Sequence, residues 1–238
     1  MTLKYASAPP HDVGSRQDWL EKRKALLLKE KALIAQQDEI AAERRALPWV
    51  KVDKAYVFET LQGERTLSDL FDGKGQLAVY HFMLAPGSDH ICGGCSFLSD
   101  HIDAARQHFE HADLAFTAVS RATLARIEEV RRRMGWTFRW VSSNKSDFNF
   151  DYGVSFDGRP GETYNFEPAT TKGEAHGVSI FAKDDDGAVF HTYSSYARGG
   201  EVFIGAFRWL DLTPKGRNEA SIMSWVELHD EYPGAEPR

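Results

Sequence analysis

Two cysteines stand three positions apart, as Cys92-Gly93-Gly94-Cys95, and the 238-residue chain contains no other cysteine. Thiols at this spacing can form a disulfide with each other, exchange it with another disulfide, or bind a metal ion. Chains whose disulfides hold the fold together carry far more cysteine than this one, so the pair is more typical of catalysis or metal binding. Cys92 and Cys95 are therefore the first candidate site.

The residues around the pair predict a strand before it and a helix after it. Residues 76–84, QLAVYHFML, are apolar at both odd and even positions, which is typical of a strand covered on both faces. The helix is predicted from apolar residues spaced four, three and four apart: Leu98, Ile102, Ala105 and Phe109. A helix N-terminus carries partial positive charge and free N–H groups, which stabilise a thiolate. We therefore expect Cys92 to have a lowered pKa and act as the nucleophile, and Cys95, one turn further, to resolve the mixed disulfide.

A second strand and helix follow in the same style. Residues 113–120 are apolar on both faces, and a second amphipathic helix ends near Gly135. The strand–helix–strand–helix order predicts two parallel strands joined by a right-handed crossover, and a CxxC motif in such a unit indicates a thioredoxin-like redox site. Because parallel strands end at the same edge of a sheet, we expect Arg121 beside Cys92, where it would support the thiolate or an anionic substrate. A structural ion pair is the alternative role for Arg121.

The second half predicts the rest of the sheet. Alternating aromatic residues in 136–143 indicate a half-buried strand, with Trp136, Phe138 and Trp140 as core residues. Residues 144–175 are expected to form a long structured loop, and residues 201–210 a closing helix. GVSIFAK and AVFHTYS, joined by Asp184–Gly187, predict a hairpin. The predicted fold class is α/β, with a thioredoxin-like central mixed sheet flanked by helices and a long N-terminal helix appended.

Several polar residues are further candidates. His191, Tyr193 and Arg198 could line a substrate pocket, with cross-strand packing as the alternative. His81 lies inside the first core strand, where we expect a hydrogen-bonded core histidine.

A metal site is the alternative chemistry for the cysteine pair. His90, Cys92, Cys95 and His101 offer thiolate and imidazole ligands that suit zinc or iron, although their spacing matches no common zinc finger. Two inert thiols in an interaction protein are a third possibility. Unless such a metal is bound, we expect no cofactor. The sequence contains no GxGxxG or Walker A motif for a nucleotide.

The N-terminal segment predicts one long helix. Ser15 and Asp18 form a capping pair, Pro48 ends the helix, and a stripe of apolar pairs recurs every seven residues from Leu26 to Ala41. This helix either packs across its own domain or forms an arm that packs on a second subunit in a homodimer. The expected organisation is a flexible tail (1–14), a helical arm (15–48), a thioredoxin-like domain (49–229) and a second flexible tail (230–238).

Composition and charge narrow the function classes. The net charge is −6, with acidic and basic residues mixed, which argues against a general nucleic-acid binder. No apolar run approaches the roughly 20 residues that cross a bilayer, and the first residues lack the apolar stretch of a signal peptide. We therefore expect a cytoplasmic protein that binds neither nucleic acid nor membrane.

A set of longer motifs resembles a known family. The motifs are VYHFM, CGGCSFLSD, VSRATL, RRMGWTFRWVSS, SDFNFDYGVSF, VSIFAKDDDGAVFHTYSSYARG and LDLTPKGR, with RRALPWVKVDKAYVF upstream. In this order, over roughly residues 16–218, they resemble the bacterial DUF899 family of thioredoxin-like proteins. The resemblance implies a thioredoxin-like fold and implies little about activity.

The sequence differs from ordinary thioredoxins at two positions. Ile91 stands where those proteins have tryptophan before the first cysteine, and Val178 stands where they have a cis-proline facing the cysteines. Because cis peptide bonds are rare without proline, the substrate-facing loop at Val178 is expected to differ. Pro86 does not fit the Pro-xxx-Thr/Ser-xx-Cys pattern of peroxiredoxins, so dithiol exchange is preferred over peroxidase activity.

The leading hypothesis is a thiol–disulfide oxidoreductase in which Cys92 attacks, Cys95 resolves and Arg121 assists. Its expected substrate is a disulfide-containing protein, a small thiol or a peroxide. The alternative is a non-catalytic or metal-binding module that assembles through its N-terminal helix.

Overall fold

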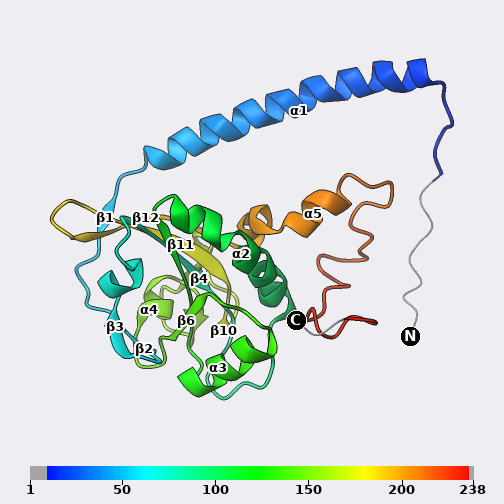
Figure 1. Ribbon diagram of the computed structural model, residues 1–238. Coiled ribbons are helices and arrows are strands. Elements are labelled where there is room, and N and C mark those ends of the chain that lie inside the picture. Colours follow the sequence, from blue (N-terminus) through cyan, green and yellow to red (C-terminus); the bar gives the residue numbers. More distant parts are fainter. Residues whose placement is uncertain (1–9, 236–238) are drawn as a thin grey trace.

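The computed structural model describes residues 10–235, so residues 1–9 and 236–238 of the two predicted tails lie outside the described part. One sheet of eight strands runs in the order β1-β12-β11-β4-β5-β6-β2-β3, with helices around it (Figure 1). Its strands are β1 (Val50–Lys51), β2 (Val57–Thr60), β3 (Gly63–Thr66), β4 (Gln76–His81), β5 (Leu114–Ser120), β6 (Arg139–Ser142), β11 (Gly177–Lys183) and β12 (Val189–Tyr196). The helices are α1 (Arg16–Arg45), α2 (Gly93–His111), α3 (Leu124–Arg133), α4 (Phe148–Asp151) and α5 (Gly205–Leu210), with 3₁₀ turns η1 (Ser68–Phe71) and η2 (Ala197–Phe203).

The centre of the sheet is the predicted mixed α/β unit. Strand β4 pairs with β5 in parallel, from Gln76 opposite Leu114 to His81 opposite Val119, and β5 pairs with β6 in parallel. On its other side β4 pairs antiparallel with β11, which forms the predicted hairpin with β12. A parallel unit that carries the cysteines is thus joined to an antiparallel hairpin and a closing helix. The predicted α/β fold class, a central mixed sheet flanked by helices with a long N-terminal helix, is confirmed.

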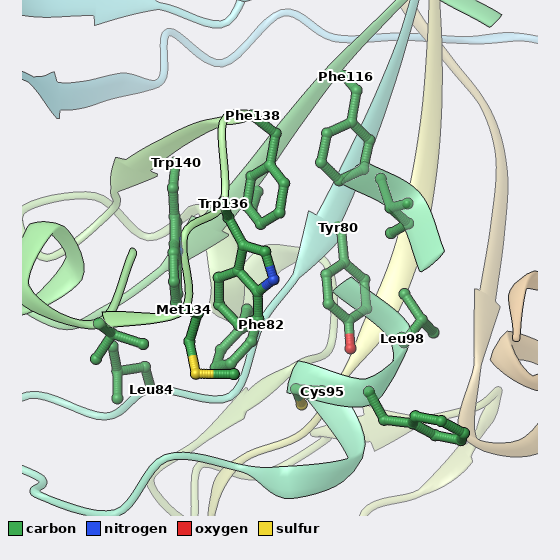
Figure 2. Packing of buried hydrophobic residues seen from close by; sticks show 14 of the residues in the cluster. Tyr80, Phe82, Leu84, Cys95, Leu98, Phe116, Met134, Trp136, Phe138 and Trp140 are labelled. Atoms are coloured by element: carbon green, nitrogen blue, oxygen red, sulfur yellow. The ribbon is translucent and has the colours of Figure 1, made fainter. Parts of the chain in front are cut away.

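Strand alternation divides the core into two clusters, one on each face of the sheet. Leu77 and Val79 of β4 point to the face covered by η1 and α4. Ala78 and Tyr80 point to the opposite face, which α2, α3 and α5 cover. The predicted core aromatics Trp136, Phe138 and Trp140 belong to this second cluster, seen in Figure 2. Both faces of β4 are therefore buried, as the apolar residues on both of its sides predicted.

His81 is the hydrogen-bonded core histidine that the sequence predicted. The side chain is fully buried, and its Nε2 lies 2.9 Å from Ser179 Oγ on β11. Burial lowers the pKa of His81 to about 3, so the ring is neutral at physiological pH.

Helix α1 begins and ends close to the predicted residues, but it does not pack against its own domain, which was one of the two predicted alternatives. Ser15 and Asp18 form a full capping box, and the helix runs 30 residues. None of its side chains is buried, and Figure 1 shows it as a rod beside the rest of the chain. At its C-terminal end Arg44 lies over the Tyr193 ring. The alternative that α1 packs across its own domain is therefore wrong, because its apolar stripe is exposed and not buried against any of residues 10–235.

The predicted loop and C-terminal segment contain more structure than expected. Residues 144–175 hold α4 and four two-residue strands: β7 (Ser155–Phe156), β8 (Thr163–Tyr164), β9 (Glu167–Pro168) and β10 (Gly173–Glu174). The expected closing helix is divided at Ile204 into η2 and α5. Within the predicted C-terminal tail, Asp230 and Glu231 form ion pairs with Arg133. Among the described residues, no helix combines the length and apolar character needed to cross a membrane.

Candidate functional site

Cys92 caps the N-terminus of α2. Its backbone is extended, and its Sγ accepts a hydrogen bond from the Cys95 N–H at 3.2 Å, the position usually taken by a serine or aspartate oxygen. The Cys95 thiol, followed by the N–H groups of Cys95 and Gly94, lowers the pKa of Cys92 to about 7 although burial opposes this. A large share of Cys92 is therefore thiolate at neutral pH.

Cys95 has the opposite environment. Its side chain is 2% exposed and belongs to the core cluster between the sheet and α2. Burial, followed by the adjacent Cys92, raises the pKa of Cys95 well above its usual range. One thiol is thus partly exposed and partly ionised at neutral pH, while the other is buried and protonated, which is the asymmetry that an attacking and a resolving cysteine need.

Two residues on the strand side of the site were missed by the sequence reasoning. The Tyr80 hydroxyl is buried and points at Cys95 in Figure 2. The Tyr80 hydroxyl and the Met83 N–H both lower the pKa of Cys95 against the effect of burial. Met83 also places its Sδ 4.0 Å from Cys92 Sγ. The usable signal was strand alternation, which turns Tyr80 toward the face where α2 packs.

A cavity of about 330 Å³ opens beside both cysteines. Its walls come from the first turns of α2, from η2, and from Tyr164, His176, Ile222 and Met223, and they are mostly apolar. Arg198 and Glu201, which form an ion pair, supply the charged groups of the lining. His176 was not predicted as a site residue, and burial lowers its pKa. The cavity has room for a small apolar group next to the Cys92 thiolate.

Arg121 does not reach the cysteines. It forms an ion pair with the nearly buried Glu174, at 3.2 Å, and lies over the Phe150 ring. The sequence correctly placed Arg121 at the edge of the sheet where β4 and β5 end, but alternation turns it toward the face of α4, away from α2. The alternative role is the one found: Arg121 is a structural ion pair, and the prediction that it supports the thiolate is corrected.

The predicted substrate residues are divided between two places. His191, Tyr193 and Arg198 line one shared hollow of about 800 Å³ at the base of α1, and of these three only Arg198 also lines the cysteine cavity. The ring of His191 bonds Ser194 Oγ at 2.8 Å. Val178 is 7% exposed and packs in the core cluster that contains Cys95. It does not line the cysteine cavity, whereas His176, two residues earlier, does. Residues 10–235 contain no cis peptide bond.

The predicted metal ligands do not converge. His101 Nε2 accepts a hydrogen bond from the Ala206 N–H at 3.0 Å, which leaves Nδ1 to donate to the Phe97 carbonyl at 2.7 Å. Both ring nitrogens are thus engaged, while His90 lines a separate hollow beside Arg133. Within the described part of the chain, no three His, Cys, Asp or Glu side chains are grouped to hold a metal. The four-residue ligand set of His90, Cys92, Cys95 and His101 is corrected accordingly.

Comparison with known proteins gives one family match. A family model described as "Bacterial protein of unknown function (DUF899)" matches residues 8–232. The comparison with curated proteins finds no match.

Several solved structures are similar at low identity. Peroxiredoxin Q from Xanthomonas campestris is 15% identical with a TM-score of 0.44, over 73% of this chain and 96% of that one. Peroxidoxin BcpB from Mycobacterium tuberculosis is 16% identical with a TM-score of 0.42, over 69% and 96%. The mitochondrial 2-cys peroxiredoxin from Plasmodium falciparum is 14% identical with a TM-score of 0.43, over 69% and 95%. These likenesses are too distant to carry an argument about activity.

Proposed function

The chain belongs to the DUF899 family, and we propose that it is a thiol–disulfide oxidoreductase that uses Cys92 and Cys95 as its dithiol. One observation carries the proposal. Cys92 caps the N-terminus of α2 with a pKa lowered to about 7, while Cys95 lies buried one turn further with a raised pKa. The proposed reaction needs no cofactor.

The reaction begins with attack by the Cys92 thiolate on one sulfur of a substrate disulfide. The substrate S–S bond breaks, its second sulfur leaves as a thiolate that takes a proton, and a mixed disulfide forms with Cys92. Cys95 then loses its proton and attacks Cys92 Sγ, which releases the first substrate sulfur as a thiol. The substrate gains two electrons, the protein is left with a Cys92–Cys95 disulfide, and an external thiol reductant restores the dithiol.

The second step requires help, because the Cys95 thiol must ionise in a buried site. The Tyr80 hydroxyl and the Met83 N–H both favour the charged form of Cys95. Donors that are already in place when a charge develops stabilise it without reorganisation. These two groups are therefore the proposed stabilisers of the resolving thiolate.

The cavity supports a small or extended apolar disulfide as substrate. Its walls are mostly apolar, and its volume of about 330 Å³ is at the small end of ligand pockets. A protein disulfide flanked by an apolar side chain and a small organic disulfide both fit this description. A peroxide remains the alternative substrate class from the sequence.

The decisive experiment is the pH dependence of Cys92 alkylation on the reduced protein, followed by peptide mass. We expect the alkylation rate to titrate near pH 7, below the value of about 8.5 for a free cysteine. Cys95→Ser should still be alkylated at Cys92, which provides the matched control. Titration of Cys92 at or above 8.5 would contradict the proposal.

Turnover gives the second measurement. With dithiothreitol as reductant and a small apolar disulfide as substrate, Cys92→Ser should lose turnover completely. Cys95→Ser should accumulate the mixed disulfide at Cys92, visible as an added substrate mass. If Cys92→Ser retains full dithiol-dependent turnover, this mechanism is wrong.

We also propose that α1 pairs with the α1 of a second copy in a homodimer. The helix exposes eight large apolar side chains: Trp19, Leu20, Leu26, Leu27, Leu28, Leu33, Ile34 and Ile40. Basic residues concentrate in residues 22–31 and acidic residues in 38–43. An antiparallel pair centred near Leu33 and Ile34 places each basic segment against the partner's acidic segment, whereas a parallel pair opposes like charges.

A further inference from the structure

Sulfur atoms gather around the two cysteines and the cavity beside them. Met83 Sδ lies 4.0 Å from Cys92 Sγ, and the Cys95 thiol is hydrogen-bonded to Cys92. Met223 lines the same cavity, with its Sδ 3.1 Å from the point where a Cβ on Gly94 would stand. The proposed dithiol exchange uses the two thiols and the Met83 N–H but gives neither thioether a role.

We propose that the reduced protein binds one Cu(I) ion through the thiolates of Cys92 and Cys95 and the thioether of Met83. This inference rests on the proposed function only in requiring that both thiols are reduced and can ionise. Thiolate and thioether sulfurs are soft donors, which favour Cu(I), zinc and iron–sulfur clusters over hard cations. A metal site of this composition contains no histidine and no carboxylate.

The distance between the sulfurs fits a shared ion. Three sulfurs that surround an ion in a plane at a metal–sulfur distance of ~2.3 Å are about 4 Å from one another. Cys92 Sγ and Met83 Sδ are already 4.0 Å apart. Met83 is held in this position from two directions, because its backbone N–H faces Cys95 while its side chain contacts Cys92. One of the three sulfur–sulfur separations that the ion requires is therefore already in place.

Zinc fits the same site poorly. Structural zinc sites use four ligands drawn from cysteine, histidine and carboxylates. His101, the predicted fourth ligand, has both ring nitrogens engaged, and the described residues hold no group of three suitable side chains. Cu(I) can be held by three sulfurs, and burial of Cys95 at 2% exposure keeps water from the ion.

Binding is a proton exchange without electron transfer. Each thiol that coordinates the ion loses its proton, so the fully protonated dithiol releases two protons per Cu(I). Copper and a disulfide substrate compete for the same two sulfurs, so the occupied site is inactive in exchange.

The test uses the reduced full-length protein, titrated without oxygen against the Cu(I) complex of bathocuproine disulfonate. We expect one Cu(I) per chain, an X-ray absorption spectrum with three sulfur neighbours, and no binding to the oxidised protein, to Cys92→Ser or to Cys95→Ser. Met83→Leu should weaken the affinity at least tenfold, by comparison with the effect of losing supporting residues around other metal sites. Met134→Leu is the matched control, since Met134 is a fully buried core residue at the C-terminus of α3 and should leave the affinity unchanged.

Three results would overturn the inference. These are an affinity no higher than that of Cys92→Ser, an unchanged affinity in Met83→Leu, or zinc binding as tight as that of Cu(I). The alkylation profile of the metal-free protein separates this failure from that of the proposed function. If Cys92 titrates near 7 and copper does not bind, only the copper site is rejected; if Cys92 titrates as a free cysteine, the oxidoreductase proposal is rejected whatever copper does.

Discussion

Helices α1 and α2 begin with similar capping interactions but differ in how much of each helix is buried. Both begin at a side chain that accepts a hydrogen bond from a backbone N–H three residues on. Yet α1 has no buried side chain in 30 residues, whereas α2 buries six in 19. The local sequence is sufficient to form either helix, and only the packing of α2 against the sheet makes its N-terminus a fixed place for chemistry.

The two N-termini differ in what occupies the cap. In α1 the Ser15 hydroxyl and the Asp18 carboxylate satisfy one another and the free N–H groups. In α2 the capping atom is the Cys92 sulfur, which is reactive once ionised, and the first turn contains no acidic residue. The positive end of α2 therefore remains available to a thiolate, whereas that of α1 is neutralised by its own carboxylate.

The largest expected effect concerns the exposed helix. Leu27→Glu combined with Ile34→Glu should halve the molecular mass in solution, because both residues lie on the apolar stripe of the proposed antiparallel pair. Gln36→Glu adds a charge to the opposite side of α1 and is the matched control. Sedimentation measures the mass, and a dimer that persists in the double variant would exclude α1 as the interface.

The next effect compares the same substitution in the two helices. Leu98 on α2 is 2% exposed, and Leu27 on α1 is 39% exposed. Leu98→Ala should cost about 2–5 kcal/mol of unfolding free energy through lost burial and a cavity. Leu27→Ala should change the unfolding of the sheet domain by no more than about 0.5 kcal/mol, measured by urea at concentrations where the chain is monomeric. Equal losses in the two variants would show that α1 packs on its own domain after all.

A pH effect isolates the N-terminus of α2. The pKa of Cys92 is about 7 in the folded protein against 9.0 for the ordinary group, so between these values the unfolded chain holds a proton that the folded chain has lost. Stability should therefore rise from pH 7 to pH 9, by at most about 1.4 kcal/mol per pH unit, and this contribution is lost as the pH falls through 7. The raised pKa of Cys95 acts against stability only above pH 9.

Urea midpoints of the reduced protein at pH 7 and pH 9 measure this rise. Cys92→Ser removes the titrating group and retains a cap, so the difference between the two proteins cancels the other groups that titrate in this range. A rise of the same size in Cys92→Ser would assign the effect to another group.

The sequence predicted those features that depend on local patterns. Apolar residues at both odd and even positions of residues 76–84 correctly predicted the central strand β4. The spacing from Leu98 to Phe109 predicted helix α2, which follows the cysteines. The prediction that Arg121 lies beside Cys92 was wrong for a definable reason. Parallel pairing placed Arg121 at the correct edge of the sheet, but the face to which its side chain points depends on the alternation along β5, which the sequence pattern did not settle. Tyr80, Met83 and His176 were missed because their proximity to the thiols arises only when separate segments pack together.

The smallest expected effect tests how much of the Cys92 pKa comes from a helix N-terminus alone. Ser15→Cys with Asp18→Asn places a thiol at the same capping position of α1 and removes the carboxylate that would oppose its ionisation. The pKa of this exposed thiol, followed by alkylation and peptide mass, should fall below about 8.5 but stay above that of Cys92, because α1 offers backbone N–H groups without a second thiol. A value as low as that of Cys92 would mean that Cys95 contributes nothing to the ionisation. A value of 8.5 or more would mean that the Cys95 thiol and the surrounding packing, and not the helix end, activate Cys92.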